Sequence, residues 1–193
     1  MNYKEKNTLD RGDILEKAIY IATKYHHGQK RKSEDIDYIY HPVCVAVKLL
    51  ENYMPKNVVC AAFLHDLVED TEYTLEDVEK DFGKEVAMYV REVTEMPKDK
   101  NTWEERKKAS IEKTKTLSKG AKCIIASDKI NNLLDIKKQI QLYGKEVCYS
   151  KFKRGEEKQK WYYTNMYKAC KYGMQDNELF SEFQNLINDV FNS

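Results

Sequence analysis

The sequence predicts an all-α protein that folds as one compact helical domain. Apolar residues recur at helical spacing along almost the whole chain, and no stretch alternates apolar and polar residues as a β-strand does. Seven glycines and three prolines in 193 residues, with 34% charged residues, favour helices with solvated faces over a turn-rich β fold. We expect a flexible polar N-terminus at residues 1–10 and a single domain over residues 11–193.

Composition and charge exclude several classes of protein. The formal net charge is +1, whereas proteins that bind nucleic acid or membrane surfaces non-specifically carry a strong charge imbalance. The longest apolar runs, such as residues 58–64, are too short to span a bilayer. Residues 1–10 are polar and contain no signal-peptide core. We therefore expect a cytoplasmic protein with no nucleic-acid or membrane partner.

The five cysteines are predicted to be reduced thiols. Their number is odd, they are widely spaced, and no Cys-x-x-Cys pair occurs, which argues against a disulfide framework or a structural zinc site. Cys44, Cys60 and Cys123 lie among aliphatic residues, as small buried hydrophobic residues do.

Helical periodicity and its start and stop signals place the helices. Pro42 suits the first turn of the second helix, Asn57 is a candidate cap for the third, and Thr74 with Asp77 resembles a capping box. The apolar stripe on the last helix either packs on the core or makes a homodimer contact. The predicted helices are 13–27, 42–54, 58–69, 75–82, 84–95, 103–117, 121–142, 156–172 and one through 179–190.

Four polar residues cluster in the third predicted helix: His65, Asp66, Glu69 and Asp70. At 100° per residue they fall within an arc of about 140° on an otherwise apolar helix. An imidazole and three carboxylates destabilise such a helix unless something compensates their burial. A divalent cation does so directly, because imidazole and carboxylate are both ligands for Mn²⁺, Fe²⁺ or Zn²⁺.

Spacing alone leaves the metal site open. A His-Asp pair is common, and a lone buried histidine is more often a core residue than a ligand. Two further candidates are distant in sequence: His41 before Pro42, and Asp128 at the end of an apolar run. A helix-cap contact would also explain His41, and a salt bridge with Lys129 or Lys122 would explain Asp128.

The ordered set His…His-Asp…Asp resembles the signature of the HD superfamily of metal-dependent phosphohydrolases. Within it, the chain resembles the (p)ppGpp hydrolase domain of RelA/SpoT proteins, especially the stand-alone small alarmone hydrolases. The resemblance covers about residues 13–172. The matching stretches are 29–32, 38–42, 61–71, 74–78, 82–86, 93–94, 105–107 and 127–133, among them the run H-D-x-x-E-D-T.

The resemblance implies a fold of the HD-domain type with one divalent metal ion, with Mn²⁺ as the expected ion. Its ligands would be His41, His65, Asp66 and Asp128. The acid pair that follows would orient or deprotonate the attacking water. This catalytic pair is Glu69 and Asp70.

The resemblance also implies a nucleotide substrate. Arg31 and Lys32 match the family's substrate-contacting pair, and Asn132 matches its nucleoside-contacting asparagine. Without a functional role, Arg31 and Lys32 would belong to a solvent-exposed run of basic residues, and Asn132 would be an exposed polar residue on a helix. Lys107, Lys153 and Arg154 are weaker phosphate candidates. With no synthetase domain expected, the protein would only degrade alarmone, releasing pyrophosphate and GDP or GTP.

Two other functions stay open. Asp37 stands where the family usually has proline, and residues 33–37 form a shortened, more acidic loop. This departure motivates a second hypothesis, hydrolysis of another phosphorylated nucleotide such as NADPH. The third hypothesis is a non-catalytic helical module that binds a nucleotide or a partner protein through the stripe on the last helix.

Overall fold

Helices form almost all of the structure. The computed structural model describes residues 13–31, 35–96, 101–150, 152 and 154–192, and within these ranges the one β feature is an isolated antiparallel bridge between Lys30 and Asp37. The predicted all-α class is therefore confirmed. The predicted N-terminal segment 1–10 lies outside the described residues. In chain order the helices are α1 (Ile14–Tyr25), α2 (Tyr40–Glu51), α3 (Lys56–Leu64), α4 (Leu67–Asp70), α5 (Leu75–Phe82), α6 (Lys84–Val93), α7 (Trp103–Thr116), α8 (Lys119–Tyr143), α9 (Lys145–Ser150), α10 (Gly155–Lys171) and α11 (Glu178–Phe191).

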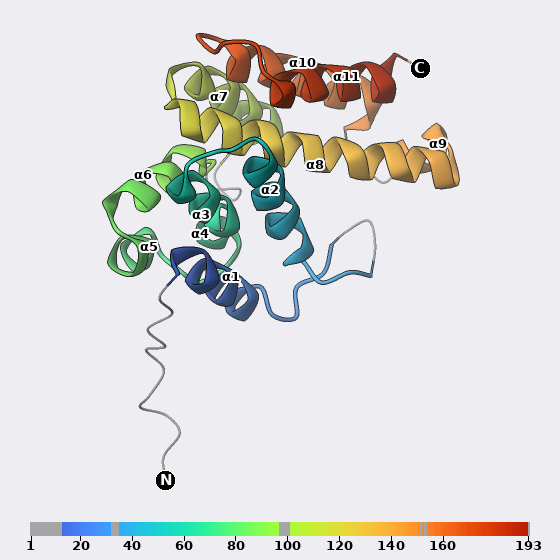
Figure 1. The fold of residues 1–193 in the computed structure, drawn as a ribbon. Helices are drawn as coiled ribbons and strands as arrows, with labels where there is room; N and C mark the ends of the chain where they lie inside the picture. The colour runs from blue at the N-terminus through green and yellow to red at the C-terminus, as the bar shows by residue number, and fades with distance from the viewer. Residues whose placement is uncertain (1–12, 32–34, 97–100, 151, 153, 193) are drawn as a thin grey trace.

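The long helix α8 is the centre of the fold. It crosses the molecule, with α1 to α6 on one side and α7, α10 and α11 on the other (Figure 1). It contacts α2, α3 and α6 on the first side and α10 and α11 on the second. Residues 120–127 of α8 are all buried, as expected of a helix covered on both sides.

Helix α3 is the second buried element. All seven residues from Val58 to Leu64 are buried, and the helix contacts α1, α2, α6 and α8. A helix that is apolar all round has no solvated face, so it must be enclosed by its neighbours. The end of α3 therefore delivers the next residues, His65 and Asp66, into the interior.

Several helix starts follow the capping chemistry expected from the sequence. The predicted capping box of Thr74 and Asp77 at α5 is confirmed, and Thr102 with Glu105 forms a second one at α7. Asp13 and Ser118 accept backbone hydrogen bonds at the starts of α1 and α8. These side chains satisfy amide groups that would otherwise lack a partner.

The prediction of one helix over residues 58–69 was wrong. The helix starts earlier, at Lys56, with Pro55 in the capping position, and the Asn57 side chain instead donates to Glu85 (2.6 Å). It ends at Leu64, and α4 begins at Leu67. The interruption lies at Asp66, whose φ of −93° and ψ of −9° place it in the sparsely populated bridge region. The four polar residues are therefore divided between a turn and a short helix.

Smaller differences concern the second helix, the cysteines and the residues after α8. Helix α2 begins at Tyr40, so Pro42 is its third residue, which still needs no amide partner. The five cysteines are free, but Cys44 is half-buried where burial was expected. The short helix α9 was not predicted. Other helix ends differ by a few residues, as fraying ends do.

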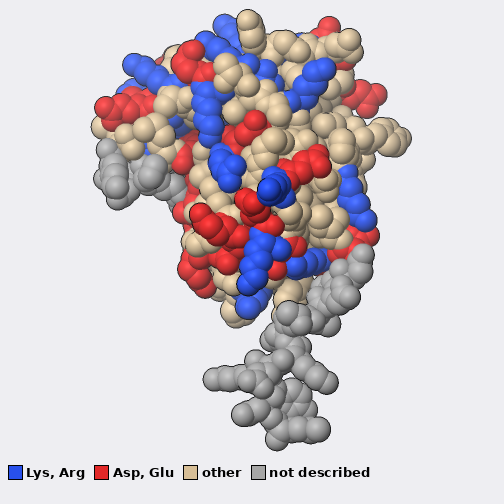
Figure 2. Space-filling model, turned by 90° about the vertical axis from the view of Figure 1, so that its left-hand side faces the viewer, with Lys and Arg blue, Asp and Glu red and all other residues tan. Residues whose placement is uncertain are grey.

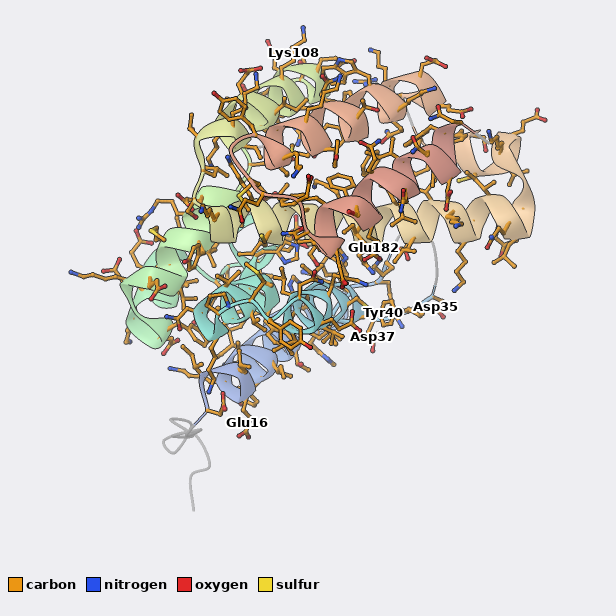
Figure 3. All side chains as sticks on the ribbon, turned by 45° about the horizontal axis from the view of Figure 1, so that its top comes forward. Glu16, Asp35, Asp37, Tyr40, Lys108 and Glu182 are labelled. Atoms are coloured by element: carbon orange, nitrogen blue, oxygen red, sulfur yellow. The ribbon has the colours of Figure 1, made fainter. Side chains whose placement is uncertain are left out.

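The surface carries charges of both signs. Lysine and arginine side chains are interspersed with aspartate and glutamate on the face drawn in Figure 2. One such pair ties α2 to α11, where Lys48 Nζ lies 3.2 Å from Glu182 Oε1 (Glu182 is labelled in Figure 3). Among the described residues, no helix combines the length and the apolar character that a membrane span requires.

Gly120 generates the first testable prediction. It is buried at the start of α8, and a Cβ atom there would lie 2.6 Å from Tyr89 Cε1 and 2.8 Å from Val58 Cγ2. We expect Gly120→Ala to lower the free energy of unfolding by about 1–3 kcal/mol, because Val58 is buried and cannot yield. Chemical denaturation measures this. Lys119→Ala at the neighbouring exposed position is the control, and an equal loss in both variants would contradict the packing argument.

Candidate metal centre and cavity

One large cavity gathers the candidate site residues. Its volume is about 1450 Å³, and helices α2, α4, α7, α8 and α10 contribute to its wall. Residues more than 60 positions apart in the sequence, such as His65 and Asp128, meet in it. The described candidates that line it are Arg31, His41, His65, Asp66, Glu69, Asp70, Asp128 and Asn132. Lys32, the remaining candidate, lies outside the described residues.

Three of the proposed metal ligands form a tight group. His41 on α2 and His65 and Asp66 after α3 offer ligand atoms that all lie within 4.8 Å of one another. Asp66 Oδ2 is 3.2 Å from His65 Nε2 and 3.7 Å from His41 Nε2. The two imidazole rings lie 5.3 Å apart, centroid to centroid. The turn between α3 and α4 makes this group possible.

Asp128 joins the group through His41. Its Oδ1 lies 3.2 Å from His41 Nε2 and accepts a hydrogen bond from Asn132 Nδ2 (2.6 Å). Its Oδ2 pairs with Lys129 Nζ (2.5 Å). The salt bridge with Lys129 that the sequence allowed is therefore present, and Asp128 also lies beside the candidate ligand His41.

The histidine tautomers suit metal binding. His41 Nδ1 lies 2.6 Å from the Asn131 side-chain oxygen, and His65 Nδ1 lies 2.7 Å from the Ala62 carbonyl oxygen. Both partners are acceptors, so each Nδ1 donates, and in the neutral ring the lone pair is on Nε2. His65 Nε2 is buried and has no hydrogen-bond partner. This arrangement is typical of metal-ligating histidine, and the residues therefore fit a divalent ion.

Electrostatics at the group favour a bound cation. Burial opposes ionisation of His41, but the hydrogen bond and charge of Asp128 outweigh it and raise the pKa of His41. Burial acts in the opposite direction on Asp128, yet Lys129 and His41 hold its pKa well below the usual range. Two carboxylates around a histidine thus stabilise positive charge at Nε2, whether it is a proton or a metal ion.

Tyr38 and Asn131 are functional candidates that sequence reasoning missed. Tyr38 Oη donates to Asp66 Oδ2 (2.6 Å), and burial together with Asp66 raises the pKa of Tyr38. Asn131 holds His41 as described above. Such outer partners orient metal ligands. Their signal was their position, since Tyr38 lies in the matched stretch 38–42 and Asn131 in 127–133.

The acid pair lies beside the metal candidates. Glu69 Oε1 accepts a hydrogen bond from the backbone amide of Glu95 (2.8 Å), which fixes the carboxylate. The Asp70 carbonyl oxygen accepts from Gln29 Nε2 (3.1 Å) and so ties α4 to the loop after α1. Glu95 was not predicted, because nothing in its local sequence distinguishes it from other surface glutamates.

The proposed substrate residues are linked to each other. Arg31 Nη2 pairs with Asp135 Oδ2 and lies 3.5 Å from Asn132 Oδ1. Asn132 in turn donates to Asp128, so a chain of polar contacts runs from Arg31 to the candidate ligands. Asn132 is half-buried rather than exposed. Lys153, a weaker phosphate candidate, lies outside the described residues, whereas Lys107 and Arg154 line the cavity.

The arrangement suits hydrolysis of a phosphate ester. Two imidazoles and two carboxylates match borderline divalent ions such as Mn²⁺, Fe²⁺ and Zn²⁺. An acid pair beside them can manage protons, and basic groups on the cavity wall can hold phosphate oxygens. The described residues therefore provide the main parts of a metal-dependent phosphohydrolase.

Comparison with known proteins shows which proteins the chain is similar to. A family model described as an HD domain matches residues 18–148. Guanosine-3′,5′-bis(diphosphate) 3′-pyrophosphohydrolase MESH1 of Homo sapiens is 38% identical over 128 residues, which are 64% of this chain and 69% of that protein. A GTP pyrophosphokinase of Streptomyces coelicolor is 48% identical over 86 residues, 45% of this chain. The chain spans about a tenth of the length of this pyrophosphokinase, since the match covers 10% of it.

Solved structures share the fold. A crystal structure of a Listeria monocytogenes EGD-e protein has a TM-score of 0.74 and 38% identity, and the match covers 79% of this chain and 99% of that one. A metazoan ortholog of SpoT that hydrolyses ppGpp has a TM-score of 0.75 and 27% identity, covering 91% of this chain and 94% of that one.

Metal addition tests the ligand group. We expect Mn²⁺ to stabilise the protein by about 2.7 kcal/mol at a concentration 100 times its dissociation constant. His65→Ala removes a candidate ligand and should abolish most of this gain in a thermal melt. His27→Ala, at an exposed position on the neighbouring loop, is the control. Equal stabilisation of the wild type and the His65 variant would exclude His65 as a ligand.

Proposed function

The chain belongs to the HD-domain phosphohydrolases, related to the (p)ppGpp hydrolases MESH1 and SpoT, and we propose that it hydrolyses guanosine alarmones. The reaction would convert ppGpp to GDP, and pppGpp to GTP, with release of pyrophosphate from the 3′ position. The observation that carries the proposal is the meeting of the candidate ligands with the acid pair in one cavity.

We assign one divalent ion, Mn²⁺, to His41, His65, Asp66 and Asp128. The orphaned Nε2 of His65 supports this assignment, because a buried imidazole nitrogen without a partner is costly. A bound divalent ion would lower the pKa of a coordinated water and neutralise charge on phosphate oxygens.

Glu69 and Asp70 would orient the attacking water and accept its proton. The hydrogen bond from the Glu95 amide holds the Glu69 carboxylate in place. An ionised carboxylate fixed in this way is an acceptor with a defined direction, which is what general base catalysis requires.

Arg31, Lys32 and Asn132 would recognise the nucleotide. The charge of Arg31 is already balanced by Asp135, so its guanidinium offers a planar face better suited to stacking on a base than to binding a free phosphate. Asn132 is placed between Arg31 and Asp128 and would contact the nucleoside. Lys32, which the resemblance pairs with Arg31, would supply the positive charge for phosphate.

Location and assembly are further parts of the proposal. All five cysteines are free thiols, as is usual in a reducing compartment, and this supports the cytoplasm. The proposed partner is a small nucleotide. A homodimer stays a prediction, and the apolar stripe of α11 does not require one, because it is buried against the chain's own core.

Replacing the acid pair tests the reaction. We expect Glu69→Gln with Asp70→Asn to lower kcat for ppGpp by about 10²-fold or more, because general base catalysis contributes 10²–10⁴-fold. Release of pyrophosphate from ppGpp by the Mn²⁺-loaded protein measures this. Glu72→Gln, at an exposed position two residues further on, should keep full activity.

Failure of the wild-type protein to turn over any (p)ppGpp species would refute the proposed substrate. Unchanged activity of the double variant would refute the role of the acid pair. If the wild type binds ppGpp tightly and releases no product, the non-catalytic nucleotide-binding module becomes the better description.

A second candidate substrate, another phosphorylated nucleotide such as NADPH, is favoured by the loop before α2. Lys30 at the cavity wall pairs with Asp37 (2.8 Å) and Asp35 (3.3 Å), which lowers the positive charge available there. Figure 3 shows Asp35, Asp37 and Tyr40 close together at this edge of the molecule. A cavity wall with less available positive charge favours a substrate with fewer phosphate groups than ppGpp.

Removing the two loop carboxylates tests this second candidate. We expect Asp35→Asn with Asp37→Asn to lower KM for ppGpp by at most a few-fold, because exposed ion pairs are weak. Steady-state kinetics with ppGpp and NADPH measure the change. A wild-type preference for NADPH that the double variant shifts toward ppGpp would support the second candidate, and no NADPH turnover would eliminate it.

A further inference from the structure

Three basic side chains line the cavity without a role in the scheme above: Arg106 and Lys107 on α7, and Lys129 on α8. Their side chains are only 13%, 15% and 13% exposed. Buried cations in a cavity wall are costly unless they are paired. Each of these three cations therefore needs negative charge nearby.

The carboxylates beside them are shared. Glu95 alone serves two cations, with its Oε1 2.6 Å from Lys107 Nζ and its Oε2 3.3 Å from Arg106 Nη1. Lys129 depends on Asp128, which also belongs to the candidate metal ligands. A divalent ion at that site would also bind the Asp128 carboxylate. Less negative charge would then remain to balance the ammonium group of Lys129.

The two lysines also lie close to one aromatic ring. Lys107 Nζ lies 4.7 Å and Lys129 Nζ 5.6 Å from the centroid of Tyr162. Burial and the charge of Lys129 lower the pKa of Lys107, as expected for two ammonium groups held close together. Two donors beside them, Arg106 Nε and Tyr162 Oη, are buried without a hydrogen-bond partner.

The charge balance of the whole cavity also favours a bound anion. Among its described lining residues are six carboxylates and six basic side chains, so their formal charges cancel. A divalent ion would add two positive charges, which is about the charge of one doubly ionised phosphate group. Four of the six carboxylates belong to the candidate ligands and the acid pair, whereas Glu95 and Asp135 pair with basic side chains.

The cluster of Arg106, Lys107 and Lys129 borders both the candidate metal ligands and the acid pair. Lys129 touches the candidate ligand Asp128, and Glu95, the partner of Lys107, gives its backbone amide to Glu69. An anion held by the cluster would therefore be a direct neighbour of a phosphate at the metal. In a pyrophosphate ester, that neighbour is the outer phosphate of the same group.

We propose that Arg106, Lys107 and Lys129 form an anion subsite for the outer phosphate of a pyrophosphoryl group whose inner phosphate faces the metal centre. The unpartnered Nε–H of Arg106, which lines the cavity, supplies a further donor close to it. The proposal rests on the proposed function, and it names the part of the substrate that the cavity distinguishes. It requires the protein to bind pyrophosphate better than phosphate.

The test is a binding comparison that needs no turnover. Inorganic pyrophosphate and inorganic phosphate are titrated calorimetrically into the Mn²⁺-loaded wild type, Lys107→Met and the control Lys108→Met. Lys108 is exposed on the same helix and lies at the outer edge of the molecule (Figure 3). Metal content is measured after each titration, so that loss of Mn²⁺ to free pyrophosphate is recognised and corrected.

We expect Lys107→Met to weaken pyrophosphate binding about tenfold or more, the effect of losing one charge-assisted hydrogen bond. Phosphate binding should change less than twofold, and Lys108→Met should match the wild type. Glu95→Gln should strengthen pyrophosphate binding, because it removes the carboxylate that competes for Arg106 and Lys107. A purely structural role of the network would instead make both variants weaker.

Equal affinity for the two anions in the wild type, or equal losses of both in Lys107→Met, would overturn the proposal. If Lys107→Met does not fold, two other variants decide the question. Lys107→Arg should keep the preference for pyrophosphate over phosphate, and Glu95→Gln should strengthen it. Hydrolysis of ppGpp without a pyrophosphate preference would refute the subsite alone. A pyrophosphate preference without hydrolysis would refute the proposed function alone.

Discussion

Compensation of the buried carboxylates Asp66 and Asp128 is the constraint on which the rest of the structure depends. Their side chains are 18% and 14% exposed, and their oxygens lie 3.7 Å and 3.2 Å from His41 Nε2. Lys129 pairs with Asp128, and Tyr38 donates to Asp66. Breaking a buried ion pair of this kind costs about 3–5 kcal/mol, far more than a surface pair. The fold must therefore hold these partners together whatever else it does.

Helix α8 meets this constraint because one of its faces packs in the core and another lines the cavity. Ala126 and Ile130 are buried in the core, while Asp128 and Asn132, four residues apart, share the side that lines the cavity. Asn131 is also buried and reaches His41 on α2. Since α8 is covered on both sides, small shifts of this helix would disturb packing and polar contacts together.

The cavity places its candidate metal ligands and its basic side chains on different elements. The candidate ligands and the acid pair come from α2, α4, α8 and the turn after α3, and basic side chains follow on α7 and at Lys129. Glu95 connects the two regions, because its amide holds Glu69 and its carboxylate holds Lys107. Such a gradient from metal-binding to anion-binding groups suits a substrate with a pyrophosphate group, whose charge extends over two phosphorus centres.

The sequence by itself determined the helical class, the capping box of α5 and the order of the candidate ligand motif. These follow from periodicity, from Thr74 and Asp77 three residues apart, and from residue types that chemistry restricts to few roles. Tertiary structure alone decided the turn at Asp66, the partners Asn131 and Glu95, and the pairing of Arg31 with Asp135. Local sequence cannot specify these, because each depends on where another helix lies. The distant His41 and Asp128 meet His65 only because the apolar α3 is enclosed by α2 and α8.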